Sequence, residues 1–249
     1  MSKIIEDTNL RNKAFIFENR EDAGRRLSVF LSDYKDSNSL VLAIPAGGVS
    51  VGKEIRDTLS LPLDLLVVRK IQIPWNPEAG FGAINLDGYV IFNEELLSHL
   101  GLPEKVINSQ IEKTKEILKK RNELFRKEMD FPSLQAKTAI IVDDGLASGY
   151  TMIAAIEFVK KRNPAKIVIA VPTGSYRTVR RISPFADILY CLSLSNSIRE
   201  AFSDIKTVKN ICKRRDLSDC SVRTCWDCYN YLGGVTFLYK FNCGNHCVS

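Results

Sequence analysis

Short apolar runs alternate with helical segments through the second half of this chain, and no other feature constrains its fold as strongly. Strand-length apolar runs occupy Thr138–Val142, Lys166–Pro172 and Asp187–Leu192, and helical patterns lie between them at Thr151–Arg162 and Ser175–Ile182. Continuous apolar runs of this length are typical of strands that are buried on both faces. Strands that alternate with helices form a parallel sheet, with any ligand site at the carboxyl ends of the strands. We therefore expect an α/β fold with an open, mostly parallel sheet and helices on both faces.

The first half of the chain shows the same alternation. Asn19 is expected to cap a helix, because its side chain can accept a hydrogen bond from the first helical turn. Leu40–Ile44 and Leu63–Val68 are expected to be buried strands, with a helix over Val49–Leu59 between them.

The middle of the chain has a different pattern. The segment Arg69–Gly82 holds several prolines and glycines, and we expect a mobile, irregular loop there. The pair Asp87-Gly88 lies between two apolar runs and predicts a hairpin. Residues 93–129 are expected to be helical, with a break at residues 101–103.

The composition is that of a globular protein with one sizeable core. The chain has 249 residues, of which 45% are hydrophobic and 26% charged. Its apolar runs are much shorter than the roughly eighteen residues that a transmembrane helix needs. Acidic residues stand near the start, where a signal peptide would have its apolar core. We therefore expect a cytoplasmic protein that has no membrane partner.

The charges and the histidines limit the possible functions. Lys and Arg number 35 against 29 Asp and Glu, and the net charge of +6 fits an anionic ligand as well as nucleic acid. Nucleic acid is the less favoured partner, because no basic stretch is interleaved with aromatic residues. The chain has two histidines, His99 and His246, too few for a Ser-His-Asp triad or a multi-histidine metal centre in its main body.

The most specific feature is a segment that runs from a buried strand through a loop of small residues into a helix. Two adjacent carboxylates at the end of the strand, Asp143 and Asp144, can accept hydrogen bonds from the two vicinal hydroxyls of a ribose. The backbone N–H groups of the following turn, at the start of a helix, are suited to a phosphate. The alternative is that the carboxylates merely end a strand and Ser148 caps a helix. The candidate binding residues are Asp143, Asp144, Gly145, Leu146, Ala147, Ser148, Gly149, Tyr150 and Thr151.

This segment resembles the phosphoribosyl pyrophosphate (PRPP) loop of the type I phosphoribosyltransferases. The chain is similar, over about residues 15–195, to a group of predicted phosphoribosyltransferases whose acceptor is unassigned. The resemblance implies a type I phosphoribosyltransferase-like domain over residues 1–198, which can form a homodimer. It also implies transfer of the 5-phosphoribosyl group of PRPP, with Mg²⁺, to a nitrogen nucleophile such as a nucleobase, and release of pyrophosphate. The further matching segments are Phe17–Gly24, Ala43–Val49, Asp64–Lys70, Asn76–Glu78 and Phe81–Ile84.

The position in the chain and the resemblance assign residues outside the PRPP loop. Arg69 and Lys70 directly follow the expected strand Leu63–Val68, at the same sheet edge as the carboxylates, and would be cations for the leaving pyrophosphate. The segment of residues 71–82 resembles the family's catalytic loop, which closes over the site, and Glu78 within it would orient the acceptor or the metal. A solvated position is the alternative for each of these three side chains. The turn that would bind pyrophosphate through its backbone consists of Pro45, Ala46, Gly47, Gly48 and Val49.

Two departures from the family pattern leave other functions open. Ala46 stands where the family usually has an arginine, and Tyr150 stands where it usually has a small residue, so the tyrosine ring must point away from the phosphate or obstruct it. The main alternative is a regulatory module that senses PRPP or a nucleotide without transferring the phosphoribosyl group. A phosphohydrolase with Asp143 as nucleophile is a third candidate, which would need a further acid and metal ligands that the sequence pattern does not identify.

Six of the seven cysteines fall within residues 212–247, where the resemblance has ended. A C-x₂-C pair and a C-x₃-C pair give four thiolates that can hold a structural Zn²⁺ tetrahedrally, and His246 can replace one of them. We expect a small Cys-rich extension over residues 199–249, with a disordered tail and incidental cysteines as the alternative. The candidate zinc ligands are Cys225, Cys228, Cys243 and Cys247.

Overall fold

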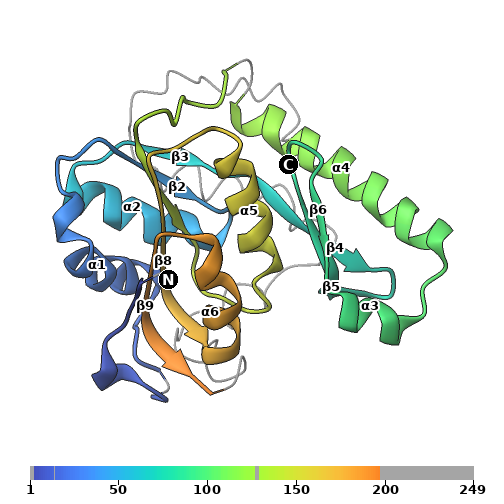
Figure 1. Cartoon of the computed structure of the whole chain (residues 1–249), viewed down its shortest axis with the longest axis horizontal. Helices are drawn as coiled ribbons and strands as arrows, with labels where there is room; N and C mark the ends of the chain where they lie inside the picture. The colour runs from blue at the N-terminus through green and yellow to red at the C-terminus, as the bar shows by residue number, and fades with distance from the viewer. Residues whose placement is uncertain (1–2, 14, 127–128, 197–249) are drawn as a thin grey trace, which may run out of the picture. The chain divides into compact units, whose positions relative to one another are not determined.

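The computed structural model describes residues 3–13, 15–126 and 129–196 (Figure 1). The predicted Cys-rich extension and its four candidate zinc ligands therefore lie outside the described residues. Among the described residues, no helix is both long enough and apolar enough to cross a membrane.

The centre of the structure is a six-stranded sheet in which every strand pairs in parallel with its neighbours. The strand order is β1-β9-β8-β7-β2-β3. The strand β3 follows β2 toward one edge of the sheet, and β8 and β9 follow β7 toward the other edge. The strands are β1 (Lys3–Ile5), β2 (Ser39–Ala43), β3 (Leu63–Leu65), β7 (Thr138–Val142), β8 (Lys166–Ser175) and β9 (Ile188–Ser195). The predicted parallel α/β fold is confirmed. Open parallel sheets bind ligands where the strand order reverses, which here is between β2 and β7.

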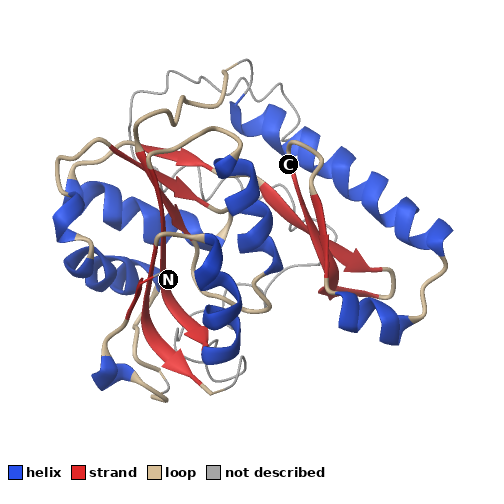
Figure 2. Cartoon of the chain, in the orientation of Figure 1, coloured by secondary structure: helices blue, strands red, loops and turns tan. Residues whose placement is uncertain are grey.

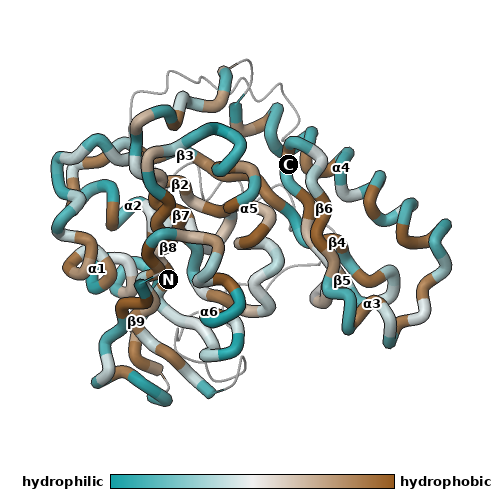
Figure 3. Tube along the Cα trace, in the orientation of Figure 1, coloured by the Kyte–Doolittle hydropathy of each residue, from teal (hydrophilic) through white to brown (hydrophobic). Residues whose placement is uncertain are grey.

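Helices cover both faces of this sheet. On one face lie α1 (Arg20–Phe30) and α2 (Gly47–Leu59), and on the other α5 (Tyr150–Lys160) and α6 (Tyr176–Ile182) (Figure 1). Each face has its own apolar cluster, and Figure 3 shows the hydrophobic colour following the central strands. Asn19 caps α1 as predicted, with its side-chain oxygen accepting from the backbone N–H of Asp22 at 2.7 Å. Short 3₁₀ helices occupy Thr8–Leu10, Ser32–Tyr34 and Ser183–Phe185.

A second, antiparallel sheet follows the third strand of the chain (Figure 2). It consists of β4 (Val68–Ile73), β5 (Asn76–Asn85) and β6 (Val90–Phe92), and it packs between α5 and a long helix. The hairpin predicted at Asp87-Gly88 joins β5 to β6. The predicted helical region, with its break, forms α3 (Glu94–Leu100) and α4 (Glu104–Arg126).

The prediction of an irregular loop over Arg69–Gly82 is wrong, because β4 and β5 pair along most of this segment. The predicted strand Leu63–Val68 is also split, with β3 ending at Leu65 in one sheet and β4 beginning at Val68 in the other. Glycine has a packing role here: a Cβ at Gly82 would lie 2.6 Å from the carbonyl oxygen of Ile91. Glycine in this segment therefore permits close strand packing instead of marking a loop.

Candidate functional site

Two loops leave the same edge of the central sheet at the point where the strand order reverses. The turn of residues 45–49, the diglycine turn, joins β2 to α2, and the segment of residues 143–151, the carboxylate loop, joins β7 to α5. Ala43 is paired with Val142 across the two strands, and the N–H of Ile44 donates to the carbonyl of Val142 at 2.9 Å. The two loops therefore begin side by side.

The diglycine turn packs directly against the carboxylate loop. A Cβ at Gly47 would lie 1.9 Å from Oδ2 of Asp144, and one at Gly48 would lie 2.6 Å from the carbonyl oxygen of Val142. No other residue fits at these two positions without a shift of the neighbouring loop. The peptide bond between Pro45 and Ala46 is cis. The two loops are thus in contact, and the contact is made through glycine.

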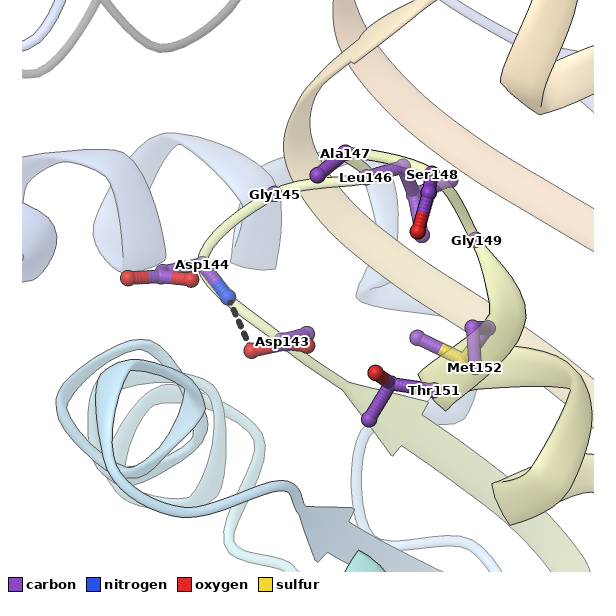
Figure 4. Close-up of a pocket in the computed structure, with 9 residues that line it drawn as sticks. All are labelled: Asp143, Asp144, Gly145, Leu146, Ala147, Ser148, Gly149, Thr151 and Met152. Carbon is purple, nitrogen blue, oxygen red and sulfur yellow. Dashed lines mark hydrogen bonds between the residues drawn. The ribbon is translucent and has the colours of Figure 1, made fainter. Parts of the chain in front are cut away.

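The carboxylate loop encloses a cavity of about 180 Å³. In Figure 4 the hydroxyls of Ser148 and Thr151 point into the hollow of the loop, whereas the Asp144 side chain points away from them. Such a cavity offers hydroxyl and backbone donors beside two carboxylates, the set that a phosphorylated polyol requires. The lining residues are Asp143, Asp144, Gly145, Leu146, Ala147, Ser148, Gly149, Thr151 and Met152. Eight of the nine predicted loop residues thus line it, and Met152 was not predicted.

Tyr150 is the predicted loop residue that does not line the cavity. It is the first residue of α5, and the guanidinium of Arg181 lies over its ring, 5.2 Å from the ring centre. The ring therefore packs against α6. We expected the ring either to point away from the phosphate or to obstruct it, and in the structure the ring points away and leaves the cavity open.

The fold strongly perturbs the pKa of Asp143. Burial raises its pKa well above the usual value, and the charge of neighbouring Asp144 acts in the same direction. The backbone N–H of Asp144, which donates to Oδ1 of Asp143 at 2.9 Å, and the positive charge of Arg20 both act in the opposite direction. A perturbed carboxylate in a cavity is a candidate functional group.

Arg20 completes this cluster and was not predicted from the sequence. Its Nε lies 2.8 Å and its Nη2 2.7 Å from Oδ2 of Asp144, and both side chains are less than one third exposed. Arg20 is the first residue of α1, where the helix dipole favours an acidic side chain. A basic residue directly after the Asn19 cap does not stabilise the helix dipole, and this was the sequence signal that Arg20 has a role outside the helix.

The structure places Arg69, Lys70 and Glu78 differently from the sequence analysis. Arg69 and Lys70 lie within β4, opposite Ile84 and Ala83, and not directly after a strand of the central sheet, because β3 ends at Leu65. Burial, together with the nearby charge of Arg121 on α4, lowers the pKa of Arg69. Glu78 belongs to β5. Neither Arg69 nor Lys70 is among the residues that line the cavity, and the predicted catalytic roles of Arg69, Lys70 and Glu78 stay predictions.

Comparison with known proteins gives consistent results. Residues 86–203 match the family model described as a phosphoribosyl transferase domain. Two curated proteins of Mycobacterium tuberculosis, MT0597 of strain CDC 1551 and Rv0571c of strain H37Rv, are each 38% identical over 178 residues, and their names class them provisionally as phosphoribosyl transferases. The match covers 72% of this chain but only 40% of each relative, so the chain spans less than half of their length.

A solved structure resembles the chain over most of its length. The protein TT1426 from Thermus thermophilus is 29% identical, with a TM-score of 0.58, and the match covers 74% of this chain and 89% of that one.

Proposed function

Because this chain contains a domain of the phosphoribosyltransferase family, we propose that it moves the 5-phosphoribosyl group of PRPP to a nitrogen nucleophile and releases pyrophosphate. The observation that carries the proposal is the joining of two loops at one sheet edge: a carboxylate pair beside a cavity with hydroxyl donors, and a diglycine turn packed against that pair. The acceptor is expected to be a nucleobase or a related small molecule.

The carboxylate loop supplies the contacts for ribose 5-phosphate. Asp143 and Asp144 accept hydrogen bonds from the two ribose hydroxyls. The turn from Ala147 to Thr151, with α5 behind it, holds the 5-phosphate through backbone N–H groups and the Ser148 and Thr151 hydroxyls.

The diglycine turn supplies the contacts for pyrophosphate. It stands at the N-terminus of α2, a helix of 13 residues, and its close packing on Asp144 brings the two subsites together. In the reaction the bond between C1′ and the pyrophosphate oxygen breaks, and its electron pair leaves with pyrophosphate. The nitrogen lone pair of the acceptor forms the new bond to C1′, and an N–H acceptor releases its proton. Arg69, Lys70 and Glu78 remain candidates for contacts with pyrophosphate and acceptor.

The donor set fits a magnesium ion that arrives with its substrate. Among the described residues there is no group of three or more His, Cys, Asp or Glu that could hold a metal. Mg²⁺ characteristically uses one or two carboxylates together with substrate phosphates, and Asp143 and Asp144 would be those carboxylates. When bound, the ion offsets the negative charge of the pyrophosphate.

The second candidate is a regulatory protein that binds PRPP without transferring it. Two observations favour it: Ala46 adds no positive charge to the diglycine turn, and Arg69 lies on β4 near Arg121. Both would leave the pyrophosphate side with fewer cations in the transition state.

Calorimetry tests the proposal with PRPP and Mg²⁺. The wild type is expected to bind, the double variant Asp143→Asn/Asp144→Asn is expected not to, and Asp130→Asn, at an exposed position, serves as the control. Absence of binding by the wild type contradicts both candidates. Release of pyrophosphate with any member of a panel of purines, pyrimidines and ammonia supports transfer, and saturated binding without release supports the regulatory protein.

A further inference from the structure

The outer side of the carboxylate loop is attached to α6 through two backbone carbonyls. The hydroxyl of Thr178 donates to the carbonyl of Ala147 at 2.6 Å, and Nη1 of Arg181 donates to the carbonyl of Ser148 at 3.0 Å. Both donors lie more than 25 positions after the loop in the sequence, and neither lines the cavity. Two consecutive peptide groups of the loop are therefore fixed from behind.

Fixing these carbonyls also fixes the direction of two N–H groups. In a trans peptide the N–H points opposite to the C=O, so the bonds to α6 turn the N–H groups of Ser148 and Gly149 away from α6. Ser148 and Gly149 both line the cavity (Figure 4). Neither N–H makes a hydrogen bond within the described part of the chain. Gly149 is buried, and a buried N–H without a partner is costly unless a ligand accepts from it.

The hydroxyl of Thr178 has one acceptor for its proton, the carbonyl of Ala147. Ser175 accepts from the backbone N–H of Thr178 at 3.2 Å and donates through its own hydroxyl to Oγ1 of Thr178 at 2.9 Å. Thr178 therefore receives one proton from Ser175 and directs its own to Ala147. Only 2% of Thr178 is exposed, so water does not compete for this bond.

Gly149 completes the attachment. Its φ is +85°, and a Cβ there would lie 2.7 Å from Cδ1 of Ile182 and 2.9 Å from Cγ2 of Thr178. The loop thus lies directly on α6 at the residue where its backbone turns, and any side chain would separate the two.

We propose that Thr178 and Arg181 are positioning residues for anion binding, which hold the peptide groups of residues 147–149 so that two N–H groups face a phosphate monoester. The identity of this monoester as the 5-phosphate of PRPP rests on the proposed function. The positioning itself does not, since any phosphate in the cavity would use the same N–H groups.

The test measures the affinity for inorganic phosphate and for PRPP with Mg²⁺, and follows the amide resonances of Ser148 and Gly149 by NMR. Thr178→Val removes the hydroxyl at almost constant volume, and Thr178→Ser restores it. Arg181→Met removes the second donor at a partly exposed site, and Arg180→Met, at the exposed neighbouring position, is its matched control.

We expect Thr178→Val and Arg181→Met each to weaken the binding of both ligands about tenfold or more. Thr178→Ser and Arg180→Met are expected to stay within about twofold of the wild type. The two amide resonances should shift with phosphate in the wild type and much less in Thr178→Val.

The outcomes separate this proposal from the proposed function. If phosphate shifts the two amides and the four variants behave as expected while PRPP does not bind, the positioning role stands and the proposed function fails. Unchanged affinities in Thr178→Val and Arg181→Met overturn the positioning role and leave the proposed function intact. If neither ligand moves the two amides in the wild type, both are overturned.

Discussion

Asp143 is placed where its charged form opposes folding, and this gives a prediction for stability against pH. Its pKa is raised by burial, so between pH of about 4, the unfolded value, and that raised pKa the native state holds a proton that the unfolded state has lost. The stability contributed by this proton falls as pH rises through the window. We expect Asp143→Asn to be more stable than the wild type at pH 8, and the gain in stability to shrink toward pH 4.

Urea unfolding of both proteins at pH 4, 6 and 8 measures this difference. Asp130→Asn, at an exposed position, controls for the loss of one negative charge. A gain in stability that is as large at pH 4 as at pH 8 would contradict the assignment. Because Asp143 is one of the two carboxylates proposed to bind the ribose hydroxyls, a gain in stability on its replacement would mark a site that sacrifices stability for function.

Gly149 combines a left-handed backbone with close packing, and a second glycine separates the two effects. Gly149 has a φ of +85°, and a Cβ there would have atoms of Ile182 and Thr178 within 3 Å, whereas Gly88 has a φ of +79° and nothing within 4 Å of a Cβ. We expect Gly149→Ala to lower the free energy of unfolding by about 2–4 kcal/mol, and Gly88→Ala by about 1–2 kcal/mol from backbone strain alone. Chemical denaturation checks both values, and equal losses would show that packing at Gly149 is unimportant.

At the scale of single residues, the sequence predicts the contacts of a local motif but not those that the fold creates. The residues of the carboxylate loop were predicted because they are consecutive and follow a buried strand. Arg20 lies 124 positions from Asp144, and its ion pair exists only because α1 and the carboxylate loop meet at one sheet edge. Thr178 and Arg181 could not be predicted either, because their contacts with the loop form only when α6 packs against it.

The long helix α4 is joined to the central sheet by a partly buried ion pair. Arg126, which is 6% exposed, donates from Nη1 and Nη2 to the two carboxylate oxygens of Asp64 at 3.1 and 2.8 Å, and also to the carbonyl of Leu65 at 2.6 Å. We expect Arg126→Met to lower the free energy of unfolding by about 2–3 kcal/mol, because Asp64 and Leu65 lose their donor. Thermal and urea unfolding measure the loss.

A surface pair on the same helix serves as the control. Lys115 and Glu112 form an exposed ion pair at 2.7 Å, and Lys115→Met is expected to change stability by less than about 0.5 kcal/mol. If the Arg126 and Lys115 variants lose the same amount of stability, the Arg126 pair contributes no more to the free energy of unfolding than an exposed pair does.

Among the elements, the buried parallel strands were predictable and the second sheet was not. Leu40–Ile44 and Thr138–Val142 are continuous apolar runs, a pattern that few structures other than a doubly covered strand produce. β4 contains Arg69, Lys70 and Gln72, and β5 has proline and glycine near its start, so both lack the apolar signal of a strand. They are stabilised by pairing with each other and by packing between α5 and α4, which no local pattern reveals. β1 is three residues long, too short to carry a pattern.

At the scale of the whole molecule, ligand binding should stabilise the fold by mass action. PRPP at about one hundred times its dissociation constant, with Mg²⁺, is expected to add about 2.7 kcal/mol of stability, or roughly 5–10 °C in melting temperature. Removal of the metal with EDTA should reverse most of the shift. An equal shift in Asp143→Asn/Asp144→Asn would place the binding elsewhere, and differential scanning calorimetry decides between these results.

The predicted zinc site concerns cysteines outside the described residues, and metal analysis of the full chain tests it. If the four thiolates bind a structural ion, the purified protein should contain about one zinc per chain, and Cys225→Ser/Cys228→Ser should lose it. Cys191→Ser, in β9, is the control and should retain the metal. A wild type without zinc would remove the prediction.

The pairing of β1 with β9 has a consequence for synthesis of the chain. In the described sheet, the register joins Lys3 to Ile188 and Ile5 to Tyr190, so β1 has no strand partner until about 185 further residues have been made. At roughly 5–20 residues per second, this takes on the order of 10–40 s on the ribosome. A strand of only three residues offers few backbone groups to a wrong partner during that interval, so its shortness protects the nascent chain from mispairing.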